Sequence, residues 1–248
     1  MASGLTADLY TDLAKADGVK VKSYPSYYIS FMNINCAKPP FDNVKVRQAM
    51  NYAINHDEII KYVEQGNAIR LHTILPEGIW GRPQEYTKYD YNPEKAKKLM
   101  KEAGYEKGFT IEQAIGTANK SWGVGIYEAA MPYLKKVGIT LKIQQMEGAA
   151  MSERIRAGEF QMYIWSIGSG SNALSAVERW KSENPQSAGN YFLYNNAEYD
   201  KLVEQAAKER DEKKRMELVM KANAIMADDA PVWFFNYNKA VMAYQPWV

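Results

Sequence analysis

Residues 168–172 are the segment best suited to hold a small polar ligand. The sequence there is Gly168-Ser169-Gly170-Ser171-Asn172, directly after a predicted strand over residues 160–166. The glycines leave backbone N–H groups accessible, and the hydroxyls and the carboxamide both donate and accept hydrogen bonds. Because ligands of α/β sheets bind at the carboxyl ends of strands, we expect Gly168, Ser169, Ser171 and Asn172 to contact a ligand. The alternative is a plain turn between a strand and a helix.

Two tryptophans lie close to such strand ends. Trp165 belongs to the strand that precedes the glycine-serine loop, and Trp122 follows another predicted strand, over residues 109–115. Each ring either stacks on a ligand or packs against a covering helix, and both interpretations stay open. Thr117 and Asn119, in the loop between that strand and Trp122, are further candidate ligand contacts.

Arg70 and Trp80 lie in a long segment without sustained periodicity, residues 67–91, which Pro76, Gly78 and Pro83 interrupt. Long irregular segments inside a domain are usually functional. A guanidinium such as that of Arg70 binds a carboxylate through two parallel hydrogen bonds. A ligand carboxylate and plain solvation are the two alternatives for Arg70.

Catalytic and metal-binding arrangements are poorly supported. His56 and His72 are the only histidines, and neither stands in a metal-like cluster with cysteine or paired carboxylates. Cys36 has no neighbouring residue in the sequence that would activate it. The Gly168-x-Gly170 pattern is too short for a phosphate loop. We therefore predict no enzyme activity, no metal and no cofactor.

Composition points to a globular binding protein. Of 248 residues, 46% are hydrophobic and 24% are charged, and 31 basic residues nearly balance 29 acidic ones. This balance argues against a nucleic-acid binder, whose basic face usually makes the domain strongly positive. The 18 tyrosines and six tryptophans provide amphipathic rings suited to a binding cleft, although a tyrosine-rich core and surface explain most of them better.

The order of predicted elements indicates an α/β fold. After a helix that begins at Asn92-Pro93, the pattern alternates between strands at 109–115, 139–145 and 160–166 and helices at 121–136 and 149–157. A β-α-β-α-β alternation predicts a sheet with helical crossovers. Further helices are expected at 44–54, with Asn43 as N-cap, and at 57–64, 173–183, 197–208 and 212–227. A short helix is also expected within residues 5–16.

Aromatic strands are predicted near both ends of the chain. One covers residues 26–33 and the other residues 231–244, and Trp233 and Trp247 are assigned to hinge and core packing. If these strands are neighbours, the chain leaves and re-enters its core at one edge, as an inserted domain does. Paired crossing strands of this kind form a natural hinge between two lobes.

Several segments together resemble the family 5 extracellular solute-binding proteins, the peptide, nickel and glutathione-type receptors of ABC importers. The two best matches are residues 40–54, Pro-Phe-Asp-Asn-Val-Lys-Val-Arg-Gln-Ala-Met-Asn-Tyr-Ala-Ile, and residues 91–105, which begin Tyr-Asn-Pro-Glu-Lys-Ala. Shorter matches follow in order at Val137-Gly138-Ile139, Gly158-Glu159-Phe160, Tyr194-Asn195-Asn196 and Asp229-Ala230-Pro231.

The resemblance implies a periplasmic-binding-protein-like lobe with a mixed central sheet flanked by helices. Residues 1–22 are expected to be the tail of a first lobe or a linker, and residues 23–248 the second ligand-binding lobe with both hinge strands. The first lobe would be missing, and the start Met1-Ala2-Ser3-Gly4 resembles an artificial start. The implied partners are a small-molecule ligand and an ABC permease in the membrane. The implied location is periplasmic or extracytoplasmic, with a lipoprotein anchor in a Gram-positive source.

The class of ligand is less well defined by the sequence. In peptide-binding relatives the loop after this strand follows a Gly-Trp pair and often carries an acid that receives the peptide amino terminus. Here Ser166-Ile167 stands at that position, and no acid occurs between Trp165 and Glu178. A short peptide, including glutathione-like ones, is favoured by the resemblance, and an oligosaccharide by the acid-free loop and the tryptophans. Nickel or haem is disfavoured by the two histidines.

Two functions of other classes stay open as alternatives. An interaction module or scaffold would keep the fold of the lobe but block its ligand edge. A hydrolase on an α/β framework would need a nucleophile and a base in mutual reach, and the sequence offers no such pair.

Overall fold

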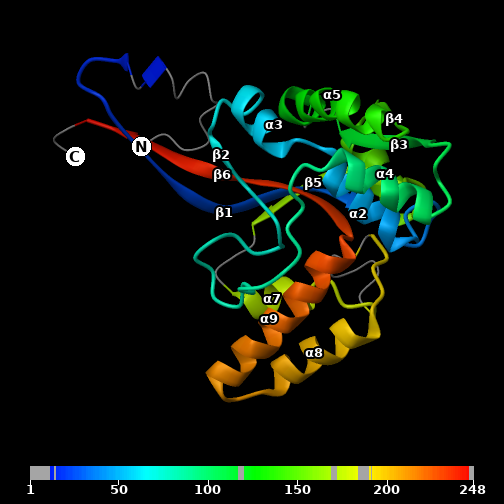
Figure 1. Ribbon diagram of the computed structural model, residues 1–248. Coiled ribbons are helices and arrows are strands. Elements are labelled where there is room, and N and C mark those ends of the chain that lie inside the picture. The colour runs from blue at the N-terminus through cyan, green and yellow to red at the C-terminus, as the bar shows by residue number, and fades with distance from the viewer. Residues whose placement is uncertain are drawn as a thin grey trace.

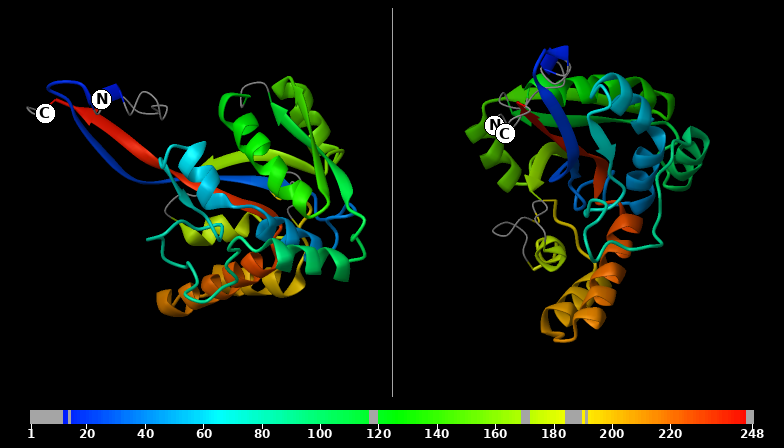
Figure 2. Two further views of the ribbon diagram at one scale, coloured as in Figure 1. Left: turned by 45° about the horizontal axis from the view of Figure 1, so that its top comes forward. Right: turned by 90° about the vertical axis from the view of Figure 1, so that its left-hand side faces the viewer.

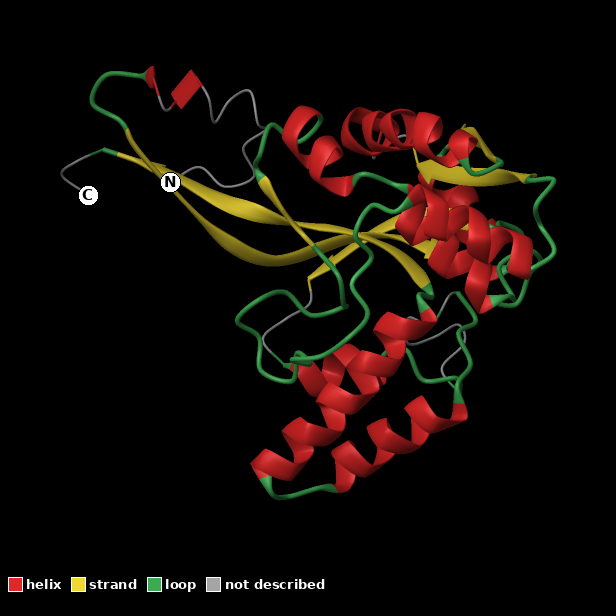
Figure 3. Ribbon diagram, viewed as in Figure 1, coloured by secondary structure: helices red, strands yellow, loops and turns green. Residues whose placement is uncertain are grey.

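The computed structural model describes residues 12, 13, 15–116, 120–168, 172–183, 190 and 192–245. Within them the chain forms one mixed sheet with helices on both of its faces (Figures 1 and 3). The strands are β1 (Lys20–Ile34), β2 (Ala68–Arg70), β3 (Phe109–Gly116), β4 (Ile139–Met146), β5 (Met162–Gly168) and β6 (Val232–Tyr244). The helices are α2 (Val44–Ala53), α3 (His56–Tyr62), α4 (Pro93–Glu102), α5 (Lys120–Lys136), α6 (Gly148–Arg156), α7 (Ala173–Glu178), α8 (Ala197–Lys208) and α9 (Glu212–Asp229).

The order of the strands in the sheet is β2-β6-β1-β5-β3-β4. β3 pairs in parallel with both β4 and β5, as the predicted crossovers through α5 and α6 require. β1 pairs antiparallel with β5 and with β6, and β2 pairs antiparallel with β6. The predicted α/β class and mixed sheet are therefore confirmed, and the two end strands β1 and β6 are neighbours.

Local sequence signals account for most helix starts. Asn43 caps α2 by accepting a hydrogen bond from the backbone N–H of Lys45, and Asn92 caps α4 in the same way with Pro93 in the first turn. Asn196 and Asp211 cap α8 and α9. The predicted helix over residues 173–183 is shorter than expected. α7 ends at Glu178, and the Trp180 ring that follows packs against Phe31 and Phe192.

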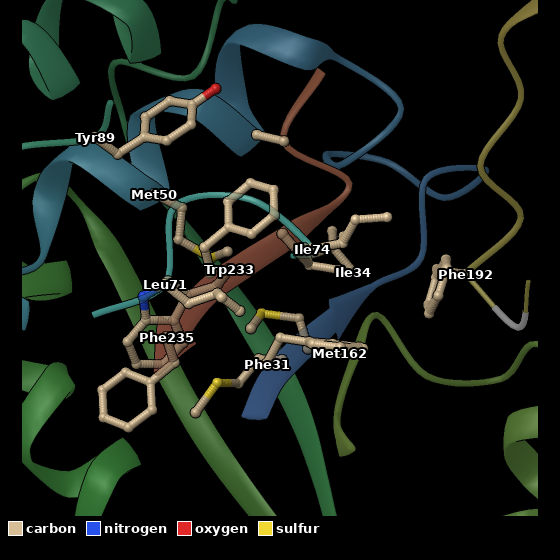
Figure 4. Packing of buried hydrophobic residues seen from close by; sticks show 14 of the residues in the cluster. Phe31, Ile34, Met50, Leu71, Ile74, Tyr89, Met162, Phe192, Trp233 and Phe235 are labelled. Atoms are coloured by element: carbon tan, nitrogen blue, oxygen red, sulfur yellow. The ribbon is translucent and has the colours of Figure 1, made fainter. Parts of the chain in front are cut away.

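Side chains of β1 and β6 supply the centre of the core. Trp233 of β6 is fully buried and contacts His56 of α3 and Tyr127 of α5. Because neighbouring residues in a strand point to opposite faces, Phe234 lies on the other face, where its ring stacks on Tyr89. Figure 4 shows this packing around Trp233. The predicted assignment of Trp233 to core packing is confirmed, whereas Trp247 lies outside the described residues.

The outer halves of β1 and β6 form a two-stranded ribbon that projects away from the helices (Figures 1 and 2). Its register runs from Lys20 opposite Tyr244 to Pro25 opposite Lys239. β5 joins β1 only from Tyr28 onward, and β2 joins β6 only over residues 236–238. We refer to residues 20–25 and 239–244 as the ribbon. Most of the predicted helix over residues 5–16 lies outside the described residues, which show helical backbone at Asp12, Leu13 and Lys15.

Candidate functional site

The carboxyl ends of β3, β4 and β5 lie at one edge of the sheet. Since these strands are parallel, Gly116, Met146 and Gly168 all end at the same edge, and α5, α6 and α7 begin just beyond it. Helix N-termini expose backbone N–H groups toward this edge. We call it the carboxyl edge, and it is the candidate ligand-binding site.

Gly168 and Asn172, the described residues on either side of the loop after β5, lie at this edge. Gly168 is the last residue of β5 and is paired with Tyr28 of β1. Asn172 is exposed and caps α7, and its side-chain oxygen accepts hydrogen bonds from Leu174 N–H and Ser175 N–H. The predicted contacts Ser169 and Ser171 lie outside the described residues.

Of the predicted residues after β3, the structure describes the backbone of Trp122, which lies at the same edge. Trp122 belongs to the first turn of α5, and Trp165 lies in β5 opposite Phe31. The described part of the structure includes the backbone but not the side-chain surroundings of these tryptophans, so the choice between ligand stacking and packing stays a prediction. Thr117 and Asn119 lie outside the described residues.

Arg70 is held by contacts within the protein. Its guanidinium donates a hydrogen bond to Tyr89 O and lies 3.9 Å from Asp57 Oδ1 and 4.0 Å from Asp90 Oδ1. Its side chain is 11% exposed, so the alternative of a solvated arginine is wrong. Burial lowers the pKa of the guanidinium, and the two aspartates oppose this effect. These contacts tie the start of the irregular segment to its end.

We expect Arg70→Met to loosen the irregular segment without unfolding the protein. The variant removes the hydrogen bond to Tyr89 and leaves two aspartates without their cation, at a cost of about 2 kcal/mol in the free energy of unfolding. Hydrogen exchange should accelerate selectively over residues 71–91. The control is Arg154→Met, which removes an exposed ion pair with Glu159 and should change stability by less than about 1 kcal/mol. Equal exchange in both variants would contradict this role of Arg70.

Trp80 is half-buried and packs against the core, in a segment that follows β2. Gly81, its neighbour, has a positive φ of 83°, and a Cβ at this position would lie 2.8 Å from a methyl group of Val219 and 3.0 Å from the Cβ of Ala173. The irregular segment is thus tightly packed onto α7 and α9. Part of Trp80 stays accessible, so its prediction as a ligand contact is still open.

The structure does not bring all the predicted residues together. Arg70 of β2 lies opposite Asn236 of β6, which lies opposite Ser30 of β1, which lies opposite Ser166 of β5. Three strand spacings therefore separate Arg70 from β5, which is roughly 14 Å. The carboxyl ends of β3 and β5 lie at one edge, and Arg70 belongs to a different part of the sheet.

Sequence reasoning missed the polar side chains in the middle of β6. Asn236 is 1% exposed, and its side-chain oxygen has no hydrogen-bond partner among the described residues. Burial and the carboxylate of Glu77 raise the pKa of the neighbouring Tyr237 hydroxyl. These two residues lie close to the row of Gly168 and Tyr28, where the ribbon leaves the lobe. The sequence feature that could have indicated them is the asparagine inside the aromatic run Trp-Phe-Phe-Asn-Tyr.

The histidines and the cysteine are placed for structure. His56 is fully buried, and its Nε2 accepts a hydrogen bond from Trp233 Nε1. Burial, with a smaller effect of Arg70, lowers the pKa of His72 to about 4, and burial raises the pKa of the Cys36 thiol to about 11. Among the described residues, no group of three or more His, Cys, Asp or Glu could hold a metal ion.

No helix in the described part of the chain has the length and apolar character to cross a membrane.

Comparison with known families shows the family to which this chain belongs. The model of the bacterial extracellular solute-binding proteins, family 5 (middle region), matches residues 1–188. The chain belongs to this family. The resemblance noted in the sequence is therefore confirmed.

Two curated relatives show how far the similarity extends. The dipeptide-binding protein of Escherichia coli is 32% identical over 225 residues, which are 89% of this chain and 42% of that protein. Heme-binding protein A of Haemophilus influenzae is 33% identical over 241 residues, 91% of this chain and 44% of that protein. The chain thus spans less than half the length of the curated relatives it matches.

A solved structure supports the fold. The periplasmic binding protein DppA of Helicobacter pylori, in complex with the peptide STSA, is 26% identical with a TM-score of 0.85. The match covers 98% of this chain and 48% of that one. The predicted periplasmic-binding-protein-like fold is therefore confirmed.

Proposed function

We propose that this chain is the second ligand-binding lobe of a receptor that serves an ABC importer. In this proposal residues 1–22 belong to the tail of a first lobe or a linker, and residues 23–248 form the second lobe with both hinge strands. The receptor captures a short peptide or glutathione-like solute and delivers it to a permease in the membrane. It works in the periplasm or elsewhere outside the cytoplasm, with a lipid anchor in a Gram-positive source.

The observation that carries the proposal is the ribbon. Segments from opposite ends of the sequence, residues 20–25 and 239–244, leave the lobe together as paired strands. They leave where β5 ends, since Tyr28, next to the ribbon, is opposite Gly168. Two paired crossings beside a ligand edge are what a hinge between two lobes requires.

The proposed mechanism is binding followed by closure of the hinge, without a covalent step. A ligand first contacts the carboxyl edge, at Gly168, Asn172 and the residues after β3. Closure then buries it against the first lobe, and contacts made only in the closed state drive that closure. The proposal requires no enzyme activity, because capture and release of the solute need only binding and closure of the hinge.

The favoured ligand is a peptide, the class named for the Escherichia coli relative and bound in the Helicobacter pylori structure. Haem is the ligand named for the Haemophilus influenzae relative, but His56 is buried in the core and His72 lies in the irregular segment, away from the carboxyl edge. Neither imidazole is placed to ligate a metal there. An oligosaccharide is the remaining alternative, because no acid follows Trp165 before Glu178.

Isothermal titration calorimetry of this chain tests the half-site directly. We expect dipeptides and tripeptides to bind with dissociation constants far weaker than micromolar, because one lobe provides only part of the closed surface. The same titration with maltooligosaccharides and haem serves as the control for ligand class. Micromolar or tighter binding of any of these solutes would contradict the half-site, and would show that the lobe has a complete site.

A further inference from the structure

Arg82 lies in the irregular segment, beside the start of α7. Its neighbour Gly81 is so close to this helix that an added Cβ would lie 3.0 Å from the Cβ of Ala173, the first residue of α7. Figure 1 shows the irregular segment running beside α7. The side chain of Arg82 is 15% exposed. A largely buried cation is therefore held next to the helix that follows β5.

The partners of Arg82 hold its guanidinium without occupying it firmly. Nη2 donates a hydrogen bond to the hydroxyl oxygen of Tyr86 at 2.8 Å. The carboxylate partner is Glu77, whose Oε1 lies 3.4 Å from Nη1 and whose side chain is 70% exposed. An ion pair with such an exposed carboxylate is weak, and a change of rotamer releases it. Arg70 differs, because it also donates to the backbone oxygen of Tyr89, which is fixed by the chain.

Tyr237 of β6 brings a second polar group to the same place. The residue is 1% exposed, and its hydroxyl lies close to Glu77, Arg82 and Tyr86. This hydroxyl makes no well-formed hydrogen bond to any described residue. Buried hydroxyls are normally hydrogen-bonded, so this one indicates a partner that a ligand supplies. A guanidinium fork beside two phenolic hydroxyls suits a planar carboxylate, which accepts several hydrogen bonds at once.

We propose that Arg82, Tyr86 and Tyr237 form a subsite for the terminal carboxylate of the solute, and that Glu77 occupies this subsite until the solute displaces it. The proposal rests on the proposed function and names the group by which the solute is held. The exposed Lys88, whose Nζ lies 5.8 Å from the centroid of the Tyr86 ring, adds positive charge at the rim. Because Glu77 competes for the same cation, its removal strengthens binding, whereas removal of Arg82 weakens it.

The register of the sheet sets the length of the solute. Tyr237 lies opposite Ile29 of β1, and Ile29 lies opposite Ile167 of β5. Ile167 directly precedes Gly168, so two strand spacings, roughly 10 Å, separate the subsite from the end of β5. An extended peptide covers at most about 3.5 Å per residue. A tripeptide therefore reaches from the carboxyl edge to the subsite, whereas a dipeptide does not.

Titration of the ¹⁵N-labelled chain with trialanine and with trialanine amide, followed by NMR, tests the subsite. Both solutes share every group except the terminal carboxylate. We expect the amide to bind about tenfold more weakly to the wild-type chain, the typical effect of a lost charge-assisted hydrogen bond. Arg82→Gln should abolish this difference. Arg154→Gln, which removes an exposed ion pair with Glu159, should keep it.

Glu77→Gln gives an independent measurement that does not need the Arg82 variant to fold. It should strengthen binding of trialanine about threefold, because an exposed competing carboxylate is removed, and Glu159→Gln should leave binding unchanged. Equal affinity for the acid and the amide, or weaker binding in Glu77→Gln, would overturn the subsite and leave the proposed function intact.

Acetate separates failure of the subsite from failure of the proposed function. If neither tripeptide binds, the proposed peptide ligand is wrong, yet acetate should still shift the Nε–Hε resonance of Arg82, and more strongly in Glu77→Gln. An Arg82 resonance that acetate does not shift would overturn the subsite.

Discussion

Trp233→Ala is expected to lower the free energy of unfolding by about 4 kcal/mol, roughly a thousandfold in the folding equilibrium. The indole is fully buried, and its ring centroid lies 5.7 Å from that of His56 and 5.6 Å from that of Phe235. Truncation leaves a cavity between the sheet and helices α3 and α5. It also leaves His56 Nε2 buried without its donor.

Urea unfolding followed by circular dichroism measures this loss. Trp233→Phe keeps an aromatic ring but removes the donor, so we expect a smaller loss than for alanine. Tyr62→Ala is the matched control, because this side chain is 69% exposed and its removal should change stability by less than about 0.5 kcal/mol. A loss below about 1 kcal/mol for Trp233→Ala would show that the centre of the core lies elsewhere.

Acid is expected to destabilise the lobe through its buried histidines. Burial, with smaller effects of Arg70 and His72, holds the pKa of His56 well below its usual 6.5. A proton on Nε2 also requires loss of the hydrogen bond from Trp233. The unfolded chain therefore binds this proton first. The contribution of His56 to the free energy of unfolding is therefore fully present above pH 6.5. Below pH 6.5 it falls by about 1.4 kcal/mol for each pH unit.

The pH dependence of urea unfolding in His56→Gln tests the assignment. Between pH 6 and pH 5, the slope of the free energy of unfolding against pH should correspond to about one proton fewer in the variant, since glutamine does not ionise. The variant His72→Gln should keep the part of this pH dependence that is due to His56. The raised pKa of Glu64, which burial causes, acts in the opposite direction and is common to all three proteins. The same slope in wild type and His56→Gln would refute the role of His56.

Local signals in the sequence were sufficient for the elements around the site. Asn43 and Asn92 mark helix starts because a cap needs only its own backbone neighbours within three residues. The alternation of strands and helices fixed the parallel order of β3, β4 and β5, and so placed Gly168 and Trp122 at one edge. The aromatic character of residues 26–33 and 231–244 raised the alternative that the two end strands are neighbours, and the pairing of β1 with β6 shows that they are.

Long-range contacts explain what the sequence could not show. The contacts of Arg70 within the protein could not be predicted, because its partners Asp57 and Tyr89 are 13 and 19 positions away and no pattern connects them. His56 follows Asn55 and precedes Asp57, a polar setting, yet it is fully buried because α3 packs onto β6. β1 runs without interruption from Lys20 to Ile34, whereas the sequence, with Lys20, Lys22 and Pro25 in this stretch, suggested two separate extended segments.

Sedimentation velocity of this chain with a separately produced first lobe and candidate peptides is the most direct test of the central claim, that the chain is one half of a hinged receptor. The account predicts that the two lobes associate only when a bound peptide is present, and that the peptide which promotes association identifies the ligand. Indifference to the first lobe with every peptide, or association that no peptide influences, would contradict it and favour an interaction module.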